Sequence, residues 1–491
     1  MVPSARSLVP ISLCATLLAG CSPEPAEQAA VTATATGSAT SSAAAATPAS
    51  ASAPASAAAS ASAAASASAA AARTVVTIAA PASDGGPGVE LARYETEWRD
   101  PTLEELRERD RKWQDEQDKQ TGEIRKGQKE KKEQERREKK ILHSSLPEAE
   151  LPASLEPFRQ VAHRPPTAQY QSGTCWAFAA TSFLESEAQR IAGREIKLSE
   201  MATAYWEYLD KAARFVAERG DSAFAEGSEA NAVTRVWKEH GAWPLAAYPG
   251  VTAQDQRYDH QRLFREANSL MEAVRDKGLW DGPSVRSLLG VVLDREMGRP
   301  PESFALDGKS TTPLGFMRDS LRIEPDDYVS LMSTLSVPFY TRGELKVPDN
   351  WWHDASYHNV PLDEFYAALR EALRRGYGAV LALDVTEPGK DAENDVMFVP
   401  DYDIPTSRID QLAREYRMAQ GVTTDDHGVH LVGFSAHAGH EWFLAKDSGR
   451  SARRGKFEGY YFIRDDYVRL KALSFMVHKD AVAELLAKFR P

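Results

Sequence analysis

The 491-residue sequence has only three cysteines, Cys14, Cys21 and Cys175, which excludes a disulfide scaffold and every four-cysteine zinc module. It also lacks an excess of positive charge, because 59 Lys and Arg stand against 71 Asp and Glu, a formal net charge of −12. A dedicated nucleic-acid-binding protein normally carries net basic charge or a basic face, so we expect no nucleic acid among the partners. Beyond the N-terminal segment, no apolar run is long enough to span a bilayer.

The N-terminus has the order of regions of a bacterial export signal. Arg6 precedes an apolar run at 8–18, and small residues and a cysteine follow. This run is too short for a transmembrane helix, so we interpret residues 1–20 as a signal peptide. The letters LAGC at 18–21 resemble a lipobox, in which cleavage before Cys21 is followed by lipidation of that cysteine. The acyl chains would anchor the protein in a bilayer, and Ser22 in place of aspartate favours the outer membrane of the cell envelope. The alternative is an ordinary secretory signal with an incidental Cys21.

Two segments of biased composition follow. Residues 21–100 are rich in Ala and Ser, with nothing else at 55–72, so they offer no large side chains to bury and are expected to be a disordered tether. Residues 101–145 form a charged segment, and its mixed signs predict a solvated helical spacer with opposite charges three and four residues apart. A contact of the basic part at 125–140 with anionic lipid or polymer is the alternative. The folded part is then one large domain or two closely packed lobes at 146–491.

The third cysteine lies where a nucleophile can be activated. Ser172 and Gly173 form a turn signal before Cys175, and a helical pattern of apolar residues begins directly after it (Ala177, Ala180, Leu184, Ala188 and Ile191). Cys175 is therefore expected at a helix N-terminus, where unpaired amides and the helix dipole favour the reactive thiolate. The alternative is a buried core cysteine.

A cysteine nucleophile needs a base and a group that orients the base. The run DDHGVHLVGF at 425–434 has strand character from His427 onward, and EWFLAKDSG at 441–449 is a second such run. Joined by residues 435–440, the two runs predict a hairpin that brings His427, at the start of one strand, beside Asp447, at the end of the other.

These segments resemble papain-like (C1) cysteine peptidases. QYQSGTCWAF at 169–178 looks like their active-site stretch, HGVHLVGF at 427–434 like their histidine strand, and WFLAKDSG at 442–449 like their asparagine segment, with the Gly-Tyr that follows matched at 459–460. The interval from Cys175 to His427 exceeds the roughly 130–150 residues of the compact papain type and suits the bleomycin hydrolase and aminopeptidase C branch, which carries a long insertion. Weaker matches to that branch lie at 198–215, 300–304 and 311–316.

The resemblance implies an α+β, two-lobed fold with a long helical insertion, in which a helical lobe carries the cysteine and a β-rich lobe carries the histidine and Asp447. It implies that Cys175 attacks the peptide carbonyl, that His427 transfers the proton, and that Gln169 and the Cys175 N–H stabilise the oxyanion. The product is a thioester that water hydrolyses. Peptides or proteins are then the substrates, and no cofactor is implied.

The sequence departs from the family pattern at three places. Asp447 stands where the family has asparagine, and a carboxylate can still accept the imidazole N–H. Gly449 replaces a tryptophan that covers this hydrogen bond in the family. The sequence ends at Pro491, short of the C-terminal arm whose carboxylate holds the substrate's amino group in the bleomycin hydrolase branch, so we expect endopeptidase or relaxed aminopeptidase activity.

Other functions remain alternatives. A catalytically weak or silent papain-like lipoprotein that binds peptides is motivated by Asp447 and Gly449, and acyl or amide transfer through the same thioester is a third possibility. The two His-x-x-His pairs, at 427–430 and 437–440, lack the acidic or cysteine ligands of an established metal site, so we expect no metal. The sequence leaves the oligomeric state open.

Overall fold

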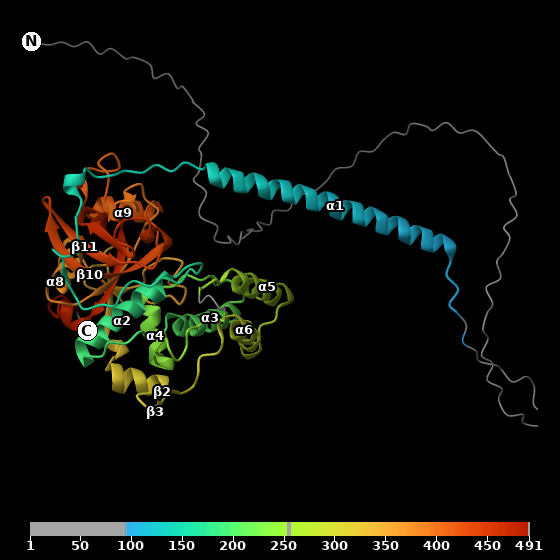
Figure 1. Cartoon of the computed structure of the whole chain (residues 1–491), viewed down its shortest axis with the longest axis horizontal. Coiled ribbons are helices and arrows are strands. Elements are labelled where there is room, and N and C mark those ends of the chain that lie inside the picture. The colour runs from blue at the N-terminus through green and yellow to red at the C-terminus, as the bar shows by residue number, and fades with distance from the viewer. Residues whose placement is uncertain (1–93, 95, 253–256, 490–491) are drawn as a thin grey trace, which may run out of the picture. The chain divides into compact units, whose positions relative to one another are not determined.

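The computed structural model describes residue 94, residues 96–252 and residues 257–489, and the chain divides into two units, Met1–Lys140 and Ile141–Pro491 (Figure 1). The expected signal peptide at 1–20, Cys14, the lipidation residue Cys21 and nearly all of the tether at 21–100 lie outside the described residues.

The described part of the first unit is dominated by one long charged helix, α1 (Pro101–Glu138). Asp100 caps it by accepting hydrogen bonds from the Thr102 and Leu103 amides, and Pro101 occupies the first turn, where a missing N–H does no harm. No residue of α1 is buried, and ion pairs such as Lys112–Glu108, 3.0 Å apart, join successive turns. The charged segment expected to be helical at 101–145 is thus helical as far as Glu138. Among the described residues, no helix has the length and apolar character needed to cross a membrane.

A helical lobe opens the second unit. Its apolar core joins five main helices through side chains such as Phe183, Tyr208 and Trp237. The helices are α2 (Cys175–Ala192), α3 (Glu200–Ala217), α4 (Ala230–His240), α5 (Gln261–Lys277) and α6 (Gly282–Met297). The small hairpin β2 (Phe304–Leu306) with β3 (Lys309–Thr311), the short α7 (Pro313–Gly315) and the π-helical turn η2 (Phe316–Leu321) follow.

A β-rich lobe follows, built on a mixed sheet in the order β5-β6-β4-β13-β7-β10-β11-β12-β9-β8, with β1 paired to β10. A second apolar core, with Leu331, Phe365 and Leu431, packs helices on this sheet (Figure 1). The strands are β1 (Arg159–Gln160), β4 (Tyr328–Met332), β5 (Arg342–Gly343), β6 (Tyr357–Asn359), β7 (Ala379–Leu383), β8 (Lys390–Asp391), β9 (Val396–Met397), β10 (His427–His437), β11 (His440–Lys446), β12 (Tyr460–Arg464) and β13 (Ala472–His478). The helices of this lobe are α8 (Leu362–Arg374), α9 (Gln411–Ala419), α10 (Asp465–Lys471) and α11 (Ala483–Leu486), and short 3₁₀ turns lie at Glu148–Glu150, Pro325–Asp327, Thr406–Arg408, Arg450–Arg453 and Lys479–Val482.

The predicted hairpin is confirmed, with longer strands than expected. β10 and β11 pair antiparallel with His437 opposite His440, so part of the expected connection at 435–440 belongs to the strands. Ala438 and Gly439 form the turn, and both have positive φ, 51° and 83°. Two such residues in succession match the twist of antiparallel strands and make the tightest connection possible.

The two lobes meet where α2 packs on the start of β10. A Cβ added to Gly428 would lie 3.4 Å from the Trp176 Cα, so the backbones approach closely at this point. The residues that precede these two are His427 and Cys175, and the lobe contact therefore brings them together. The apolar stripe predicted for α2 is too narrow, because the helix is buried all round from Trp176 to Ala188. A helix placed between two cores has no solvent face.

Candidate active site

Cys175 is the first residue of α2, as predicted, and is a free, half-buried thiol. The preceding Thr174 makes no side-chain cap, so no side chain of that residue competes for the first helix amides. The turn before it is fixed from outside the helix: the Gly173 N–H donates to Glu226 Oε2 at 2.5 Å, and the Trp176 indole N–H donates to the Glu226 carbonyl at 3.1 Å. The segment before α4 therefore lies alongside the cysteine loop.

His427 and Asp447 form a hydrogen-bonded pair. Their Nε2 and Oδ1 atoms are 2.8 Å apart, and the Gly449 N–H donates to the same Oδ1 at 2.6 Å. Asp447 is held in place through its own backbone, since its N–H donates to the Gly459 carbonyl at 2.9 Å. Gly459 has a φ of 84°, and a Cβ there would collide with Pro166, so glycine is required. With Nε2 engaged, the other ring nitrogen of His427 is available to the Cys175 thiol.

The electrostatics of this pair favour a charged imidazolium. Burial by itself would lower the pKa of His427, but the charge and hydrogen bond of Asp447, together with the Cys175 sulfur, outweigh it and raise that pKa to about 10. Burial acts in the opposite sense on Asp447, yet His427, Lys390 and the Gly449 N–H hold the pKa of this carboxyl below its usual value. The arrangement can therefore hold a proton on the imidazole of His427 next to Cys175.

Gln169 is attached to the segment that carries Asp447. Its Oε1 accepts a hydrogen bond from the Ser448 hydroxyl at 2.7 Å, and its backbone N–H donates to the Ser448 carbonyl at 3.0 Å. Its Nε2 donates to the Ser172 carbonyl at 2.6 Å. A primary amide carries two N–H donors, so one remains for an oxygen above the cysteine loop.

Several charged residues near the His427–Asp447 pair were not predicted from the sequence. Lys390 on β8 is half-buried, and burial lowers its pKa against the opposing charges of Asp447 and Asp426. Asp425 and Asp426 directly precede His427 in the sequence, and this adjacency was the one available signal. Glu226 and Lys390 are far from every recognised motif, and only the fold brings them to the site.

The histidine pairs do not form metal sites with their own sequence neighbours. His430 is fully buried and pairs with the Ser182 hydroxyl at 2.8 Å, and His440 pairs with Asp465 at 3.0 Å. Among the described residues, one group with possible ligand spacing lies elsewhere and consists of Asp210, Glu239 and His240. The Asp210 carboxylate already binds the guanidinium groups of Arg235 and Arg286, at 2.9 and 3.0 Å, which opposes a second cation there.

Comparison with known proteins agrees with this geometry. No family model matches the chain. Aminopeptidase C of Lactococcus lactis subsp. cremoris is 22% identical over 383 residues, which are 70% of this chain and 85% of the relative. Aminopeptidase C of Listeria innocua is 22% identical over 255 residues, 44% of this chain and 58% of the relative. The crystal structure of PepW from Lactobacillus rhamnosis superposes with a TM-score of 0.54 at 17% identity, covering 67% of this chain and 83% of that one.

The solved structure shows that the fold is papain-like with an α+β architecture, and the relatives support a papain-like (C1) cysteine peptidase, as the sequence motifs predicted. Within this class its relatives are aminopeptidases C, on the bleomycin hydrolase branch. Because the relatives are only 22% identical to this chain, the role of each residue rests on the geometry of the site.

Proposed function

We propose that the chain hydrolyses peptide bonds with Cys175 as nucleophile, His427 as proton carrier and Asp447 as the residue that orients the imidazole. The observation that carries this proposal is the hydrogen bond of 2.8 Å between His427 and Asp447, beside a thiol at the start of α2. The raised pKa of His427 supports transfer of the Cys175 proton to the imidazole before attack.

The steps follow from the groups present. The Cys175 thiolate attacks the carbonyl carbon and forms a C–S bond, while the carbonyl oxygen becomes an oxyanion. The Cys175 N–H and the remaining Gln169 N–H are the proposed donors to that oxyanion. His427 then gives its proton to the leaving amine as the C–N bond breaks. Water attacks the thioester, His427 accepts the water proton, and the thiol is regenerated with release of the carboxylic acid.

The range of substrates is the finer part of the proposal. We propose endopeptidase or relaxed aminopeptidase activity rather than strict removal of N-terminal residues. In support, Phe489, among the described residues after β13, lies near one edge of the sheet: it contacts the rings of Tyr340 and His358, and β6 is separated from β10 by three strands. Comparison of N-acetylated with free-amine peptides tests this, and hydrolysis confined to free amines would overturn it.

We also propose that the enzyme is a lipoprotein of the cell envelope, attached to the outer membrane through Cys21. The support is the letters LAGC at 18–21 behind a charged and apolar leader. Labelling of cells with a fatty acid tests it: wild type is expected to incorporate the label, and Cys21→Ser is expected to lose the label and the membrane association. Labelled Cys21→Ser would contradict the proposal.

The central experiment is cleavage-site profiling of wild type beside Cys175→Ala, with labelling of Cys175 by a thiol-directed epoxide. Removal of a nucleophile typically lowers kcat by roughly 10⁴-fold or more, so the variant should leave every peptide intact. Cys175→Ala should also remain unlabelled. A wild-type protein that is neither labelled nor able to cleave any peptide would favour the alternative, a silent peptide-binding domain.

A further inference from the structure

The charged helix α1 has no part in the proposed catalysis, and its charge is unevenly distributed. Residues 125–140 contain nine Lys and Arg against four Glu, a net charge of +5. Residues 101–124 contain five Lys and Arg against eight Asp and Glu. Because the whole chain has a net charge of −12, residues 125–140 are a local concentration of positive charge in an acidic protein.

Four of these cations lie on one face of α1. They follow one another at steps of four, three and four residues, so they form a straight row about 16 Å long, which we call the basic stripe (Arg125, Lys129, Lys132 and Arg136). At about 100° per residue, the acids of the same segment lie about 70° or more from the centre of the basic stripe (Glu130, Glu133, Glu135 and Glu138). Positive and negative side chains are therefore sorted onto different faces of the helix.

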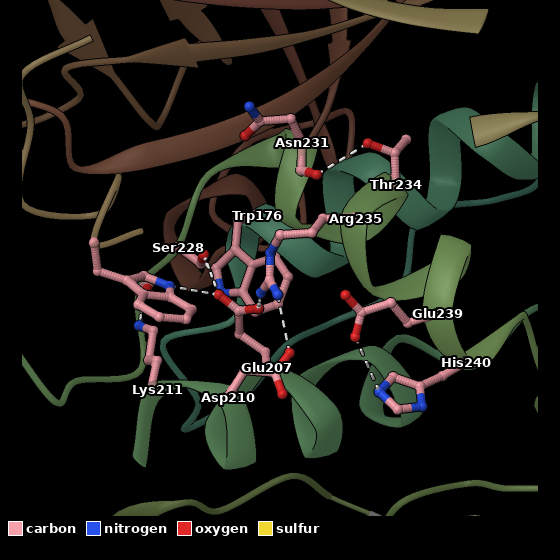
Figure 2. A network of polar contacts seen from close by, with 12 residues as sticks. Trp176, Glu207, Asp210, Lys211, Ser228, Asn231, Thr234, Arg235, Glu239 and His240 are labelled. Carbon is pink, nitrogen blue, oxygen red and sulfur yellow. Dashed lines mark hydrogen bonds and ion pairs between the residues drawn. The ribbon is translucent and has the colours of Figure 1, made fainter. Parts of the chain in front are cut away.

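The basic side chains of α1 differ from those of the helical lobe in how their charge is balanced. In that lobe Arg235 of α4 binds Glu207 and Asp210 of α3 (Figure 2). In the basic segment of α1 the ion pairs join only successive turns, at 3.7–4.0 Å, and their Lys side chains are 77–79% exposed, so they contribute little. Among the described residues, neither Arg125 nor Lys132 forms an ion pair. Since like charges three and four residues apart repel, the basic stripe is suited to an anionic partner.

Large apolar side chains of α1 are exposed next to the basic stripe. Leu106, Trp113 and Ile124 are spaced by seven and eleven residues, which places them in one line, and they are 38%, 63% and 62% exposed. This apolar line and the basic stripe together fall within about 160° of the helix circumference. A helix lying flat on a bilayer can therefore direct both toward the lipid, and the bilayer interface favours tryptophan as well as basic residues.

We propose that this side of α1 binds the surface of a bilayer that contains anionic phospholipids. The basic stripe contacts the headgroup phosphates, and Trp113 and Ile124 lie at the edge of the acyl region. Arg136 is five residues before Ile141, where the second unit begins, so the contact holds the start of the peptidase domain within about 18 Å of the lipid surface. The inference depends neither on the proposed catalysis nor on an acyl chain at Cys21.

The test is cosedimentation of the full chain with vesicles, in the Cys21→Ser background so that no acyl group contributes. The vesicles are phosphatidylcholine alone, which measures any contribution of the N-terminal leader, or equal parts of phosphatidylcholine and phosphatidylglycerol. Because each cation near an anionic surface strengthens binding, we expect partition onto the anionic vesicles to be at least about tenfold stronger. NaCl at about 1 M shortens the Debye length to about 3 Å and should remove the difference. Equal binding to both vesicles at low salt would overturn the proposal.

Two variants of equal net charge locate the contact on the helix. The stripe variant combines Arg125→Gln, Lys129→Gln, Lys132→Gln and Arg136→Gln. The control variant combines Lys112→Gln, Lys119→Gln, Lys126→Gln and Arg137→Gln, four cations on the side of α1 away from the basic stripe and the apolar line. Glutamine is a good helix former, so α1 should persist in both, which circular dichroism checks. The stripe variant should lose most of the preference for anionic vesicles, and the control should keep it within about twofold. Equal losses would show attraction by net charge alone and would overturn the proposed face.

The apolar line distinguishes a bilayer from a soluble polyanion. Trp113→Gln with Ile124→Gln keeps every charge of α1, so this variant also tests the proposal if the stripe variant loses its helix. It should bind anionic vesicles about fivefold or more weakly, because apolar area no longer leaves water, and should bind inorganic polyphosphate as the parent chain does. Unchanged binding to vesicles would indicate a soluble polyanion as the partner and would overturn the bilayer.

Discussion

Two buried carboxyl groups, those of Asp447 and Glu229, have surroundings that differ. Asp447, which follows β11, accepts hydrogen bonds at its Oδ1 from the His427 ring and the Gly449 amide. Glu229 hydrogen-bonds with Asp425 and the Tyr357 hydroxyl, and the charges of Asp349 and Asp354 also act on it. The pKa of Asp447 is held low and the pKa of Glu229 is raised to about 7. The pKa of the same chemical group thus moves in opposite directions at the two places, because positive charges act on Asp447 while burial and further acids act on Glu229.

After replacement of the nucleophile itself, the largest effect is expected from Gln169, which is attached to the segment of Asp447 because its Oε1 accepts a hydrogen bond from the Ser448 hydroxyl. Gln169→Ala should lower kcat by about 10²–10³, because a donor to the oxyanion contributes only in the transition state. Steady-state hydrolysis of one unblocked and one blocked peptide measures this. Gln169→Glu is the matched control, since it keeps the acceptor for Ser448 but removes the donor. Activity retained in Gln169→Glu would contradict the assigned role.

Asp447 should give the next largest effect, with a distinct pH signature. Asp447→Ala should lower kcat/KM by roughly 10²-fold, because the imidazole loses its orientation. In Asp447→Asn burial of His427 remains while the carboxylate charge is lost, so the pKa of His427 falls from about 10. The imidazolium that protonates the leaving amine is then lost at a lower pH. The basic limb of the kcat/KM profile should move toward neutral pH in Asp447→Asn, and an unmoved limb would show that Asp447 does not set this pKa.

Replacement of the acid by the corresponding amide should change the free energy of unfolding in opposite directions at Glu229 and at Asp447. The folded-state pKa of Glu229 is raised to about 7 from 4.5, so its ionisation penalises folding as pH rises above 4.5. Glu229→Gln should therefore increase the free energy of unfolding at pH 8 by about 1–3 kcal/mol, with no gain near pH 4.5. Asp447→Asn should decrease it at pH 8 by about 1–3 kcal/mol, since the ion pair with His427 is lost.

Urea denaturation of the same protein preparations at both pH values measures these changes. Glu239→Gln, on an exposed part of α4, is the control and should stay within about 0.5 kcal/mol of wild type. If Glu229→Gln and Asp447→Asn changed the free energy of unfolding in the same direction at pH 8, the expected difference between the two carboxyl groups would be wrong.

The smallest effect is expected at Gly449. A Cβ there would lie 3.0 Å from Asp447 Oδ1 and 3.3 Å from His427 Cε1, tighter than ordinary contacts. Gly449→Ala should lower kcat/KM by about two- to fivefold through a small displacement of the pair, without moving the pH profile. Kinetics over pH 5–10 measure both quantities. If Gly449→Ala lowered kcat/KM more than Asp447→Ala does, the free space next to the His427–Asp447 pair, rather than the carboxylate of Asp447, would determine the position of the imidazole.

The motifs determined the fold class and the place of each catalytic candidate on its element. The turn and apolar pattern at 172–191 placed Cys175 at a helix start, and the two apolar runs around 427–447 predicted the hairpin. These are local signals, carried by residues close together in the chain, so sequence can express them. The extent of burial of α2 could not be foreseen, because it depends on a second core contributed by residues some 200 positions later.

The sequence by itself therefore determined which side chains can attack, carry a proton and accept a hydrogen bond. Only the tertiary structure decided which other charged groups lie near them. Glu226, Glu229 and Lys390 belong to no motif, and they reach the site because α4 and β8 fold against the cysteine loop and the hairpin. The physical reason is that charge acts across space rather than along the chain: a carboxylate acquires its pKa and its use from neighbours that the fold assembles.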